Sequence, residues 1–283
     1  MDSLRGRRIL ITGASSGIGR ATALGLARRG ASLLLTGRTP ARCDEALAAV
    51  RAAGAAEARM FRTDFASLDA VRQLAADVRR EAPRLDVLVN NAAVVARRRT
   101  LTADGYETTF AVNHLSPFLL TGLLLPLLGR GARIVNVASA AHRWGAVDLD
   151  DLHNERDYRA LRAYGQSKTA NILWTLELAR RLEGSGVTAN SLHPGAIRSN
   201  LGGGQGFATD LLWRLAGLFM KPTERGAETP IHLAASPAVE GLSGRYFADC
   251  RERQPAPYAT DPATAARLWQ LSETLTGLRY PAA

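Results

Sequence analysis

The stretch that decides the fold is residues 8–20, with the sequence RILITGASSGIGR. Its first part is an apolar run that ends at Gly13, and from Gly17 the apolar residues recur at helical spacing. Glycines at 13, 17 and 19 allow a tight turn and let a pyrophosphate approach backbone N–H groups at a helix N-terminus, where the helix dipole favours negative charge. The stretch therefore predicts a strand, a phosphate-binding turn and a helix, although its glycine spacing differs from the most familiar dinucleotide fingerprint.

Beyond this turn, apolar runs of strand length alternate with stretches of helical spacing. Strands are predicted over residues 8–12, 32–36, 58–62, 86–89, 133–138, 187–192 and 244–248, and helices over 17–29, 41–53, 68–80, 161–182, 224–235 and 262–275. Continuously apolar strands separated by helices indicate a parallel sheet covered on both faces. We therefore expect an α/β chain with one doubly wound, Rossmann-type domain over residues 1–283, a parallel sheet of about seven strands and helices on both faces.

Residues 196–223 depart from this alternation. Four glycines between 202 and 206 precede a very apolar stretch of helix length, residues 207–220. We interpret this insert as a helical lid over an apolar substrate, with the glycines as its hinge. A helix packed on the core or on a dimer face would have the same composition, and contact with a membrane surface is a third interpretation.

Charge and histidine content exclude several classes of partner. The formal net charge is +10, but the arginines are scattered in pairs, and only residues 97–99 form a basic run. We therefore expect no nucleic-acid partner. Five scattered histidines without paired cysteine or carboxylate spacing predict no metal site.

Cysteine content and hydropathy indicate the compartment. Cys43 and Cys250 are too few for a disulfide framework, and the first residues do not resemble a signal peptide. The longest apolar run, residues 117–128, is too short to span a bilayer. We expect a cytoplasmic protein without a transmembrane segment.

Tyr164 and Lys168 lie four residues apart in the predicted helix 161–182, so their side chains share one face, one turn apart. A nearby ammonium favours the phenolate and lowers the pKa of a tyrosine, which makes it usable as an acid or base nearer neutrality. An ordinary amphipathic helix would produce the same spacing by chance. Only Lys168 and Lys221 are lysines among 36 basic residues, however, and a compact ammonium suits proton chemistry better than a guanidinium.

The end of the second predicted strand selects the cofactor. An acidic residue there would bind the ribose hydroxyls of NAD and repel a 2′-phosphate, whereas this chain has Arg38, with Arg20 just after the first turn. Two guanidinium groups favour NADP(H) over NAD(H). The alternative explanation is that arginine is merely abundant in this chain.

Together these residues resemble the short-chain dehydrogenase/reductase family over nearly the whole chain. The shared motifs are Thr12-Gly-x3-Gly-x-Gly19, Asp64, Asn90-Asn91-Ala92-Ala93, Asn113, Ser139, Tyr164-x3-Lys168 and Pro194-Gly195, in the family's order and spacing. Within the family the chain is most similar to the retinol dehydrogenase and dehydrogenase/reductase-member type, through residues 112–115, 133–142, 163–168, 170–173, 191–195 and 242–247.

The resemblance implies a role for each motif. Tyr164 would be the general acid in reduction and the base in oxidation, Lys168 would lower its pKa and hold the nicotinamide ribose, Ser139 would bind the substrate oxygen, and Asn113 would hold a water that links Lys168 to solvent. The cofactor would lie against Gly13, Ser15, Ser16, Gly17, Ile18, Gly19, Arg20, Arg38, Asp64, Phe65, Asn90, Ala92, Tyr164, Lys168, Pro194, Gly195, Ile197 and Ser199. The resemblance also implies a homo-oligomer, with the Tyr164 helix and its neighbour as a dimer face.

We therefore predict an NADP-dependent oxidoreductase that interconverts a carbonyl and an alcohol, by hydride transfer, on an apolar substrate of retinoid, steroid or polycyclic type. The alternative is a catalytically silent dinucleotide-binding scaffold or sensor, and the intact set of four catalytic residues weighs against it. The candidates for substrate contacts are His142, Trp144, Trp213 and Phe219. For His142, exposure to solvent in a loop is the simpler interpretation.

Overall fold

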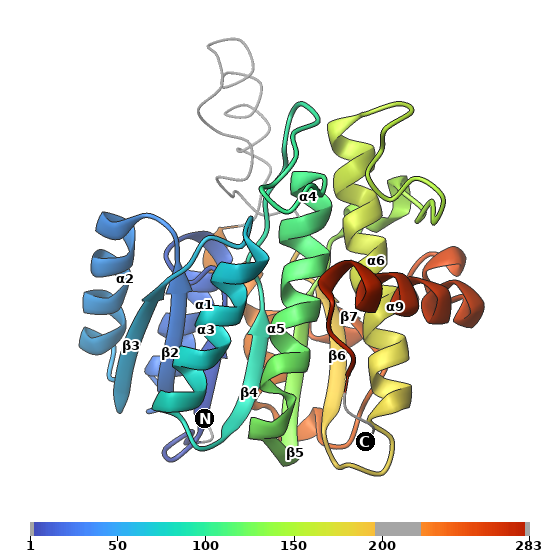
Figure 1. Ribbon diagram of the computed structural model, residues 1–283. Coiled ribbons are helices and arrows are strands. Elements are labelled where there is room, and N and C mark those ends of the chain that lie inside the picture. The colour runs from blue at the N-terminus through green and yellow to red at the C-terminus, as the bar shows by residue number, and fades with distance from the viewer. Residues whose placement is uncertain (1–2, 196–221, 281–283) are drawn as a thin grey trace.

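The computed structural model describes residues 3–195 and 222–280 (Figure 1). Within these residues one sheet contains eight strands, namely β1 (Arg8–Ile11), β2 (Ser32–Gly37), β3 (Glu57–Arg62), β4 (Leu85–Asn90), β5 (Leu128–Val137), β6 (Thr188–His193), β7 (Tyr246–Ala248) and β8 (Arg251–Glu252). The strand order is β3-β2-β1-β4-β5-β6-β7-β8, and every neighbouring pair except β7 and β8 is parallel. The predicted doubly wound fold is confirmed.

Successive residues of a strand point to opposite faces of the sheet, and each face has its own core. Ile9 and Ile11 of β1 belong to one hydrophobic cluster, and Leu10 between them belongs to the other. Because both faces of these strands are buried, apolar residues do not have to alternate with polar ones, and the strands are continuous apolar runs in the sequence.

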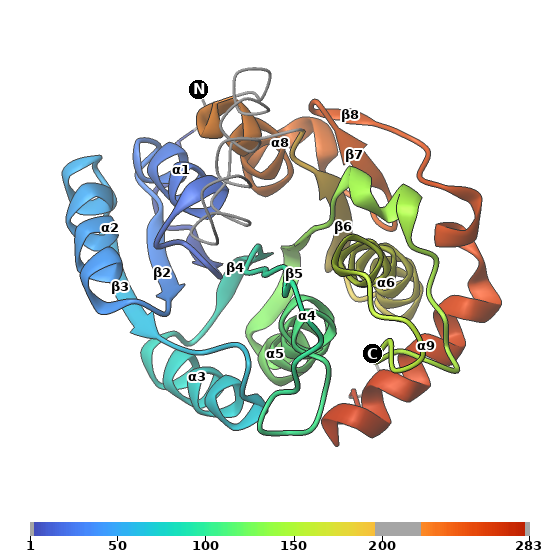
Figure 2. The ribbon, with the colours of Figure 1, turned by 90° about the horizontal axis from the view of Figure 1, so that it is seen from above.

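Helices cover both faces of this sheet (Figure 2). One face carries α1 (Gly17–Ala27), α2 (Pro40–Ala52) and α8 (Thr223–Ala235), and the other carries α3 (Leu68–Glu81), α5 (Ser116–Leu124) and α6 (Ala160–Arg181). Helix α9 (Pro262–Thr276) lies outside α6. The loops after β1, β2, β4, β5 and β6 all emerge at the carboxyl edge of the sheet, where ligands bind in folds of this type.

Two features of the sheet differ from the prediction. Strand β8 was not expected, because two residues are too short to show a periodic pattern; it turns back antiparallel to β7 through Asp249 and Cys250, which have φ values of 51° and 57°. The sheet therefore has eight strands where about seven were predicted. Strand β5 also begins at Leu128, upstream of the expected start.

Residues 108–127 form a helical stretch that no helical periodicity indicated. It consists of α4 (Thr108–Phe110), the π-helical turn η1 (Ala111–Leu115), α5 and the 3₁₀ turn η2 (Leu125–Leu127). This stretch is long and apolar enough to cross a membrane, but 78% of its apolar window is buried inside the protein. A helix that is buried on nearly all sides shows no amphipathic stripe, so we assign it to the core.

Helix α9 covers the outer side of α5 and α6. Trp269 of α9 is 1% exposed, and its ring lies 5.1 Å from that of Phe118 on α5 and 4.3 Å from the guanidinium of Arg181 on α6. The Tyr280 ring packs on both, at 4.9 Å from Phe118 and 4.5 Å from Trp269. Part of the face of α5 and α6 is therefore covered by α9 within the chain, and the homo-oligomer stays a prediction.

We predict that Trp269→Ala lowers the free energy of unfolding by about 3–5 kcal/mol, because it leaves a cavity among Phe118, Trp174 and Tyr280. The matched control is Trp144→Ala, since Trp144 is 67% exposed and should change stability by less than about 0.5 kcal/mol. Urea unfolding followed by far-ultraviolet circular dichroism measures both. An equal decrease in the free energy of unfolding of the two variants would show that Trp269 of α9 does not contribute to the packing of the core.

Candidate active site

The turn between β1 and α1 requires its glycines. Gly13 and Gly17 have φ values of 67° and 54°, a backbone region that residues with a Cβ rarely adopt. A Cβ on Gly13 would lie 2.9 Å from the Cα of Ala92, and one on Gly19 would collide with the carbonyl of Gly13 and the Asn91 amide. Ser16 is the N-cap residue of α1, and its side chain makes no capping bond to the first N–H groups of α1.

The chain after β4 holds this turn in place. The backbone N–H groups of Asn91 and Ala92 donate to Thr12 Oγ1 at 2.9 and 3.0 Å, and Asn91 Nδ2 donates to the Thr12 carbonyl at 2.8 Å. The side-chain amide of Asn90 donates to Thr121 Oγ1 of α5 and to Asn136 Oδ1 of β5, and the cofactor contact expected for Asn90 stays a prediction. Asn91 is therefore the asparagine whose side chain braces the turn, a role that the sequence does not distinguish because its neighbour Asn90 is chemically identical.

The end of β2 lies beside the same turn. A Cβ on Gly37 would lie 2.7 Å from the Cβ of Ser15, so the end of β2 lies against the Ser15 side chain, and the exposed Arg38 follows Gly37 directly in the chain. Arg38 makes no hydrogen bond or ion pair within the described part of the chain. Arg20, the other predicted guanidinium, is held by Glu45 at 2.8 Å. Arg38 is thus the arginine that is free to meet an anion there.

Asp64 and Phe65 follow β3 at the same edge of the sheet. Asp64 is exposed, and its Oδ1 accepts from the backbone N–H of Ala66 at 3.0 Å. Phe65 is buried, and its carbonyl accepts from Ser116 Oγ at 2.6 Å. At the carboxyl end of β3, Asp64 is therefore open to solvent, whereas Phe65 is packed inside the protein.

Helix α6 approaches the loop after β5 very closely. This loop contains the 3₁₀ turn η3 (Ala140–Trp144). A Cβ on Gly165 would lie 2.6 Å from the Ala141 carbonyl, and one on Gly145 would lie 2.6 Å from the Arg162 carbonyl, so only glycines permit this contact. Thr169 Oγ1 closes it by donating to the Gly145 carbonyl at 2.6 Å.

This contact brings three of the predicted catalytic residues together. Ser139 directly precedes η3, and its hydroxyl lies close enough to Tyr164 on α6 to oppose the rise in the pKa of that tyrosine. Lys168, one turn further along α6, is 2% exposed, and its Nζ donates to the Val137 carbonyl of β5 at 2.9 Å. The same Nζ lies 5.5 Å from the centre of the Tyr164 ring. A hydroxyl, a phenol and an amine thus meet at the carboxyl end of β5.

The pKa values of this pair differ from the sequence expectation. Burial raises the pKa of Tyr164, and the hydrogen bond from Ser139 opposes the rise only in part. Burial also lowers the pKa of Lys168 to about 7, so its ammonium is only partly populated at neutral pH. The expected lowering of the tyrosine pKa by Lys168 is therefore wrong for the protein alone, because both groups are desolvated at the same place.

Asn113, the fourth predicted catalytic residue, lies on the π-helical turn η1 and braces the site. Its side chain accepts from the Val94 N–H at 2.8 Å and donates to the Val94 carbonyl and to Ser167 Oγ, both at 3.0 Å. Its carbonyl accepts from Asn171 Nδ2 at 2.9 Å. Asn113 therefore ties the loop after β4 to the residue that precedes Lys168.

The predicted substrate residues are separated by the structure. Trp144 is exposed, whereas His142 is fully buried and both of its ring nitrogens are engaged by backbone groups. The prediction that His142 lines the substrate pocket and the simpler one that it is exposed are both wrong, because the C-terminal segment around Ala256 covers it. Ile197, Ser199, Trp213, Phe219 and nearly all of the predicted lid over 196–223 lie outside the described residues, and helix α8 already begins at Thr223.

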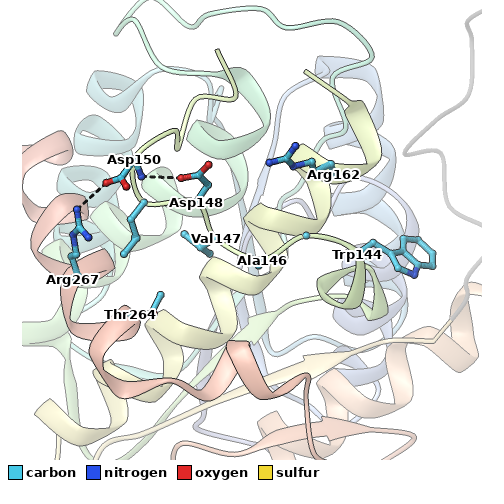
Figure 3. A pocket seen from close by; sticks show the side chains of 10 residues that line it. Trp144, Ala146, Val147, Asp148, Asp150, Arg162, Thr264 and Arg267 are labelled. Atoms are coloured by element: carbon cyan, nitrogen blue, oxygen red, sulfur yellow. Dashed lines mark hydrogen bonds and ion pairs between the residues drawn. The ribbon is translucent and has the colours of Figure 1, made fainter. Parts of the chain in front are cut away.

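A pocket of about 470 Å³ opens between the loop after η3, the first turns of α6 and α9 (Figure 3). Asp150 in its rim pairs with Arg267 at 2.9 Å, and Trp144 points away from that pair in Figure 3. Its described lining does not include Ser139, Tyr164 or Lys168. We therefore do not place the substrate in this pocket.

Pro194 and Gly195 follow β6 at the catalytic edge. Gly195 has a φ of 95°, and its N–H donates to His193 Nδ1 at 3.2 Å. The N–H of Ala140 donates to the same nitrogen at 3.2 Å. His193 therefore couples the loops after β5 and β6.

Residues 7–206 match a family model described as short chain dehydrogenase. The chain is similar to human retinol dehydrogenase 14, with 44% identity over 97% of this chain and 88% of that protein. It is also similar to the crystal structure of an uncharacterised protein from Mycobacterium paratuberculosis, with a TM-score of 0.79, 34% identity and coverage of 99% and 97%. A short chain dehydrogenase from Burkholderia cenocepacia J2315 in complex with NADP has a TM-score of 0.71 and 29% identity, over 87% of this chain and 97% of that one.

The buried lysine predicts a specific pH dependence of stability. Its pKa is about 7 in the folded protein against an ordinary value of 10.5, so between these values the unfolded chain binds more protons than the native one and stability rises with pH. We expect the free energy of unfolding of the native protein, minus that of Lys168→Met, to increase by about 2 kcal/mol from pH 7 to pH 9. Urea unfolding at three pH values measures this. A difference that is constant or falls would contradict the depressed pKa.

Proposed function

Since this chain belongs to the short chain dehydrogenase family, we propose that it is an NADP-dependent oxidoreductase that interconverts a carbonyl and an alcohol on an apolar substrate. The observation that carries the proposal is the meeting of Ser139, Tyr164 and Lys168 at the carboxyl end of β5. This set faces the same edge of the sheet as the glycine turn of α1. An acid-base pair beside a dinucleotide-binding turn is what hydride transfer to a carbonyl requires.

The residues at the turn fit a phosphorylated dinucleotide. The missing Cβ atoms of Gly13 and Gly19 let a pyrophosphate approach the backbone, and the first N–H groups of α1 are oriented to bind it. The exposed Arg38, directly after Gly37 at the end of β2, would bind a 2′-phosphate in this proposal. The NADP complex of the Burkholderia relative supports this choice. When bound, the cofactor supplies or accepts the hydride.

Tyr164 and Ser139 would act on the substrate oxygen. Because Ser139 and Tyr164 interact at the same place, the hydroxyls of both can donate to one substrate oxygen in the proposal. In reduction the Tyr164 hydroxyl gives its proton to that oxygen, and in oxidation the Tyr164 oxygen takes the proton back. Burial keeps Tyr164 protonated in the protein alone, which suits the reducing direction.

Lys168 would return the proton to Tyr164. With a pKa of about 7 it can lose and regain a proton near neutral pH at little cost in free energy. Its Nζ is anchored by the Val137 carbonyl, and Asn113 fixes Ser167 next to it. A water held by Asn113 between Lys168 and solvent completes this relay in the proposal.

The substrate is proposed to be an apolar carbonyl or alcohol of retinoid, steroid or polycyclic type. The similarity to retinol dehydrogenase 14 supports the retinoid-like class. The exposed Trp144, five residues after Ser139, offers a large apolar surface near the catalytic edge. We further propose a cytoplasmic location, in keeping with the free thiols of Cys43 and Cys250.

We predict that Tyr164→Phe lowers kcat by about 10²- to 10⁴-fold and leaves the Kd for NADPH within about twofold, because it removes only the transferable proton. NADPH oxidation with a panel of apolar aldehydes and ketones measures kcat, and fluorescence titration measures Kd. The control is Tyr106→Phe, whose hydroxyl bonds the Leu275 carbonyl at 2.7 Å, away from Ser139. Retained turnover would refute the tyrosine assignment, and a wild-type chain that binds NADPH but turns over no substrate would support the silent scaffold.

We predict that the wild-type protein has a higher kcat/KM with NADPH than with NADH. Arg38→Ala should lower kcat/KM for NADPH by about 10- to 100-fold through the loss of a charge-assisted hydrogen bond, with little change for NADH. Arg79→Ala, an exposed arginine on α3, is the matched control and should change neither value. A wild-type preference for NADH would contradict the role of Arg38.

A further inference from the structure

His142 is buried beside the catalytic serine, and its environment specifies one protonation state. The side chain has no exposed surface. Its Nδ1 lies 2.7 Å from the Ser139 carbonyl, which can only accept, so Nδ1 must carry a proton. Its Nε2 lies 3.1 Å from the backbone nitrogen of Ala256, which can only donate, so Nε2 must be bare. Only the neutral Nδ1–H tautomer satisfies both contacts.

The two contacts join parts of the chain that are more than a hundred residues apart. Ala256 precedes the 3₁₀ turn η6 (Pro257–Thr260), and Ala259 in that turn packs with Ala138, the residue before Ser139. Tyr258 Oη donates to the His142 carbonyl at 2.7 Å, and the Tyr246 ring meets the imidazole edge-on at 5.3 Å. His142 is thus enclosed between the catalytic loop and the C-terminal segment.

We propose that His142 is a positioning residue for Ser139: as the neutral Nδ1–H imidazole it holds the main chain of Ser139 against the segment around Ala256, and so keeps the serine hydroxyl beside Tyr164. The proposal rests on the proposed function, in which these two hydroxyls bind the substrate oxygen. A displacement of about 1 Å at such a position can lower a rate by up to about 10²-fold. Replacing His142 should lower the rate through the loss of the bond from Nδ1–H to the Ser139 carbonyl, because this is the contact between the imidazole and the catalytic serine.

Two amide variants separate the two contacts. In His142→Asn the side-chain amide can occupy the place of Nδ1–H and donate to the Ser139 carbonyl, but nothing accepts from Ala256. In His142→Gln the side-chain oxygen can occupy the place of Nε2 and accept from Ala256, but the donor to Ser139 is lost. His142→Leu loses both contacts.

Three quantities are measured for each variant. Steady-state kinetics with NADPH and a carbonyl substrate of the wild-type protein give kcat, titration gives the Kd for NADPH, and thermal unfolding gives Tm. We expect His142→Asn to keep kcat within about threefold of the wild-type value, and His142→Gln and His142→Leu to lower kcat by about 10- to 100-fold. The Kd for NADPH should not change in any variant. Tm should fall by similar amounts in the two amide variants. A kcat that falls in parallel with Tm in both amide variants, or a fully active His142→Leu, would overturn the proposal.

The tautomer is tested without turnover, which separates this proposal from the proposed function. In protein labelled with nitrogen-15 at histidine, the His142 signals are identified by their loss in His142→Asn. We expect a protonated Nδ1 and a bare Nε2 at neutral pH. A protonated Nε2, or an imidazolium, would refute the positioning role even if the enzyme is active. The expected tautomer in a chain that shows no turnover would leave Ser139 positioned as described and refute only the proposed function.

Discussion

The close approach of helix α6 to the loop after β5 is the contact on which the rest of the site depends. Gly145 and Gly165 face each other so tightly that a Cβ on either would meet backbone atoms. Because of this contact the first turns of α6 lie directly over the carboxyl end of β5, and Tyr164 and Lys168 reach Ser139 and the Val137 carbonyl. A wider separation would leave the same side chains in solvent with ordinary pKa values. The chemistry of the site is thus a consequence of backbone packing.

That packing determines the electrostatics. Enclosing an amine and a phenol away from water disfavours the charged form of each, so the pKa of Lys168 falls and that of Tyr164 rises. Such a pair can pass a proton near neutral pH, which an exposed lysine with its ordinary pKa would do poorly. The single hydrogen bond from Lys168 Nζ to the Val137 carbonyl orients the amine but does not restore full solvation.

The C-terminal part of the chain, residues 253–280, packs against the elements that carry Asn113, Ser139, Tyr164 and Lys168 but supplies none of these four side chains. Helix α9 closes the aromatic cluster of Phe118, Trp174 and Trp269 over α5 and α6, and the segment from Arg253 to Thr260 covers the loop that carries Ser139. Arg181 strengthens the first contact, since its side chain lies over the Trp269 ring while it pairs with Glu177 at 2.7 Å. These long-range contacts give α6 and the catalytic loop a rigid outer wall, so that the hydroxyls of Ser139 and Tyr164 keep one arrangement.

Three features could be predicted from the sequence because each depends only on residues that are close along the chain. They are the alternation of apolar strands with helices, the glycine turn after β1, and the spacing of Tyr164 and Lys168 on one helix face. Each rests on a local rule, either the period of an element or a φ value that only glycine tolerates. Only tertiary contacts show that Asn91 holds the turn, that Arg20 is paired while the Arg38 side chain has no partner among residues 3–195 and 222–280, and that His142 is buried. They also account for the core helix over 108–127. Burial also reversed the expected pKa shift at Tyr164. These properties depend on desolvation and on partners distant in sequence, which no local pattern records.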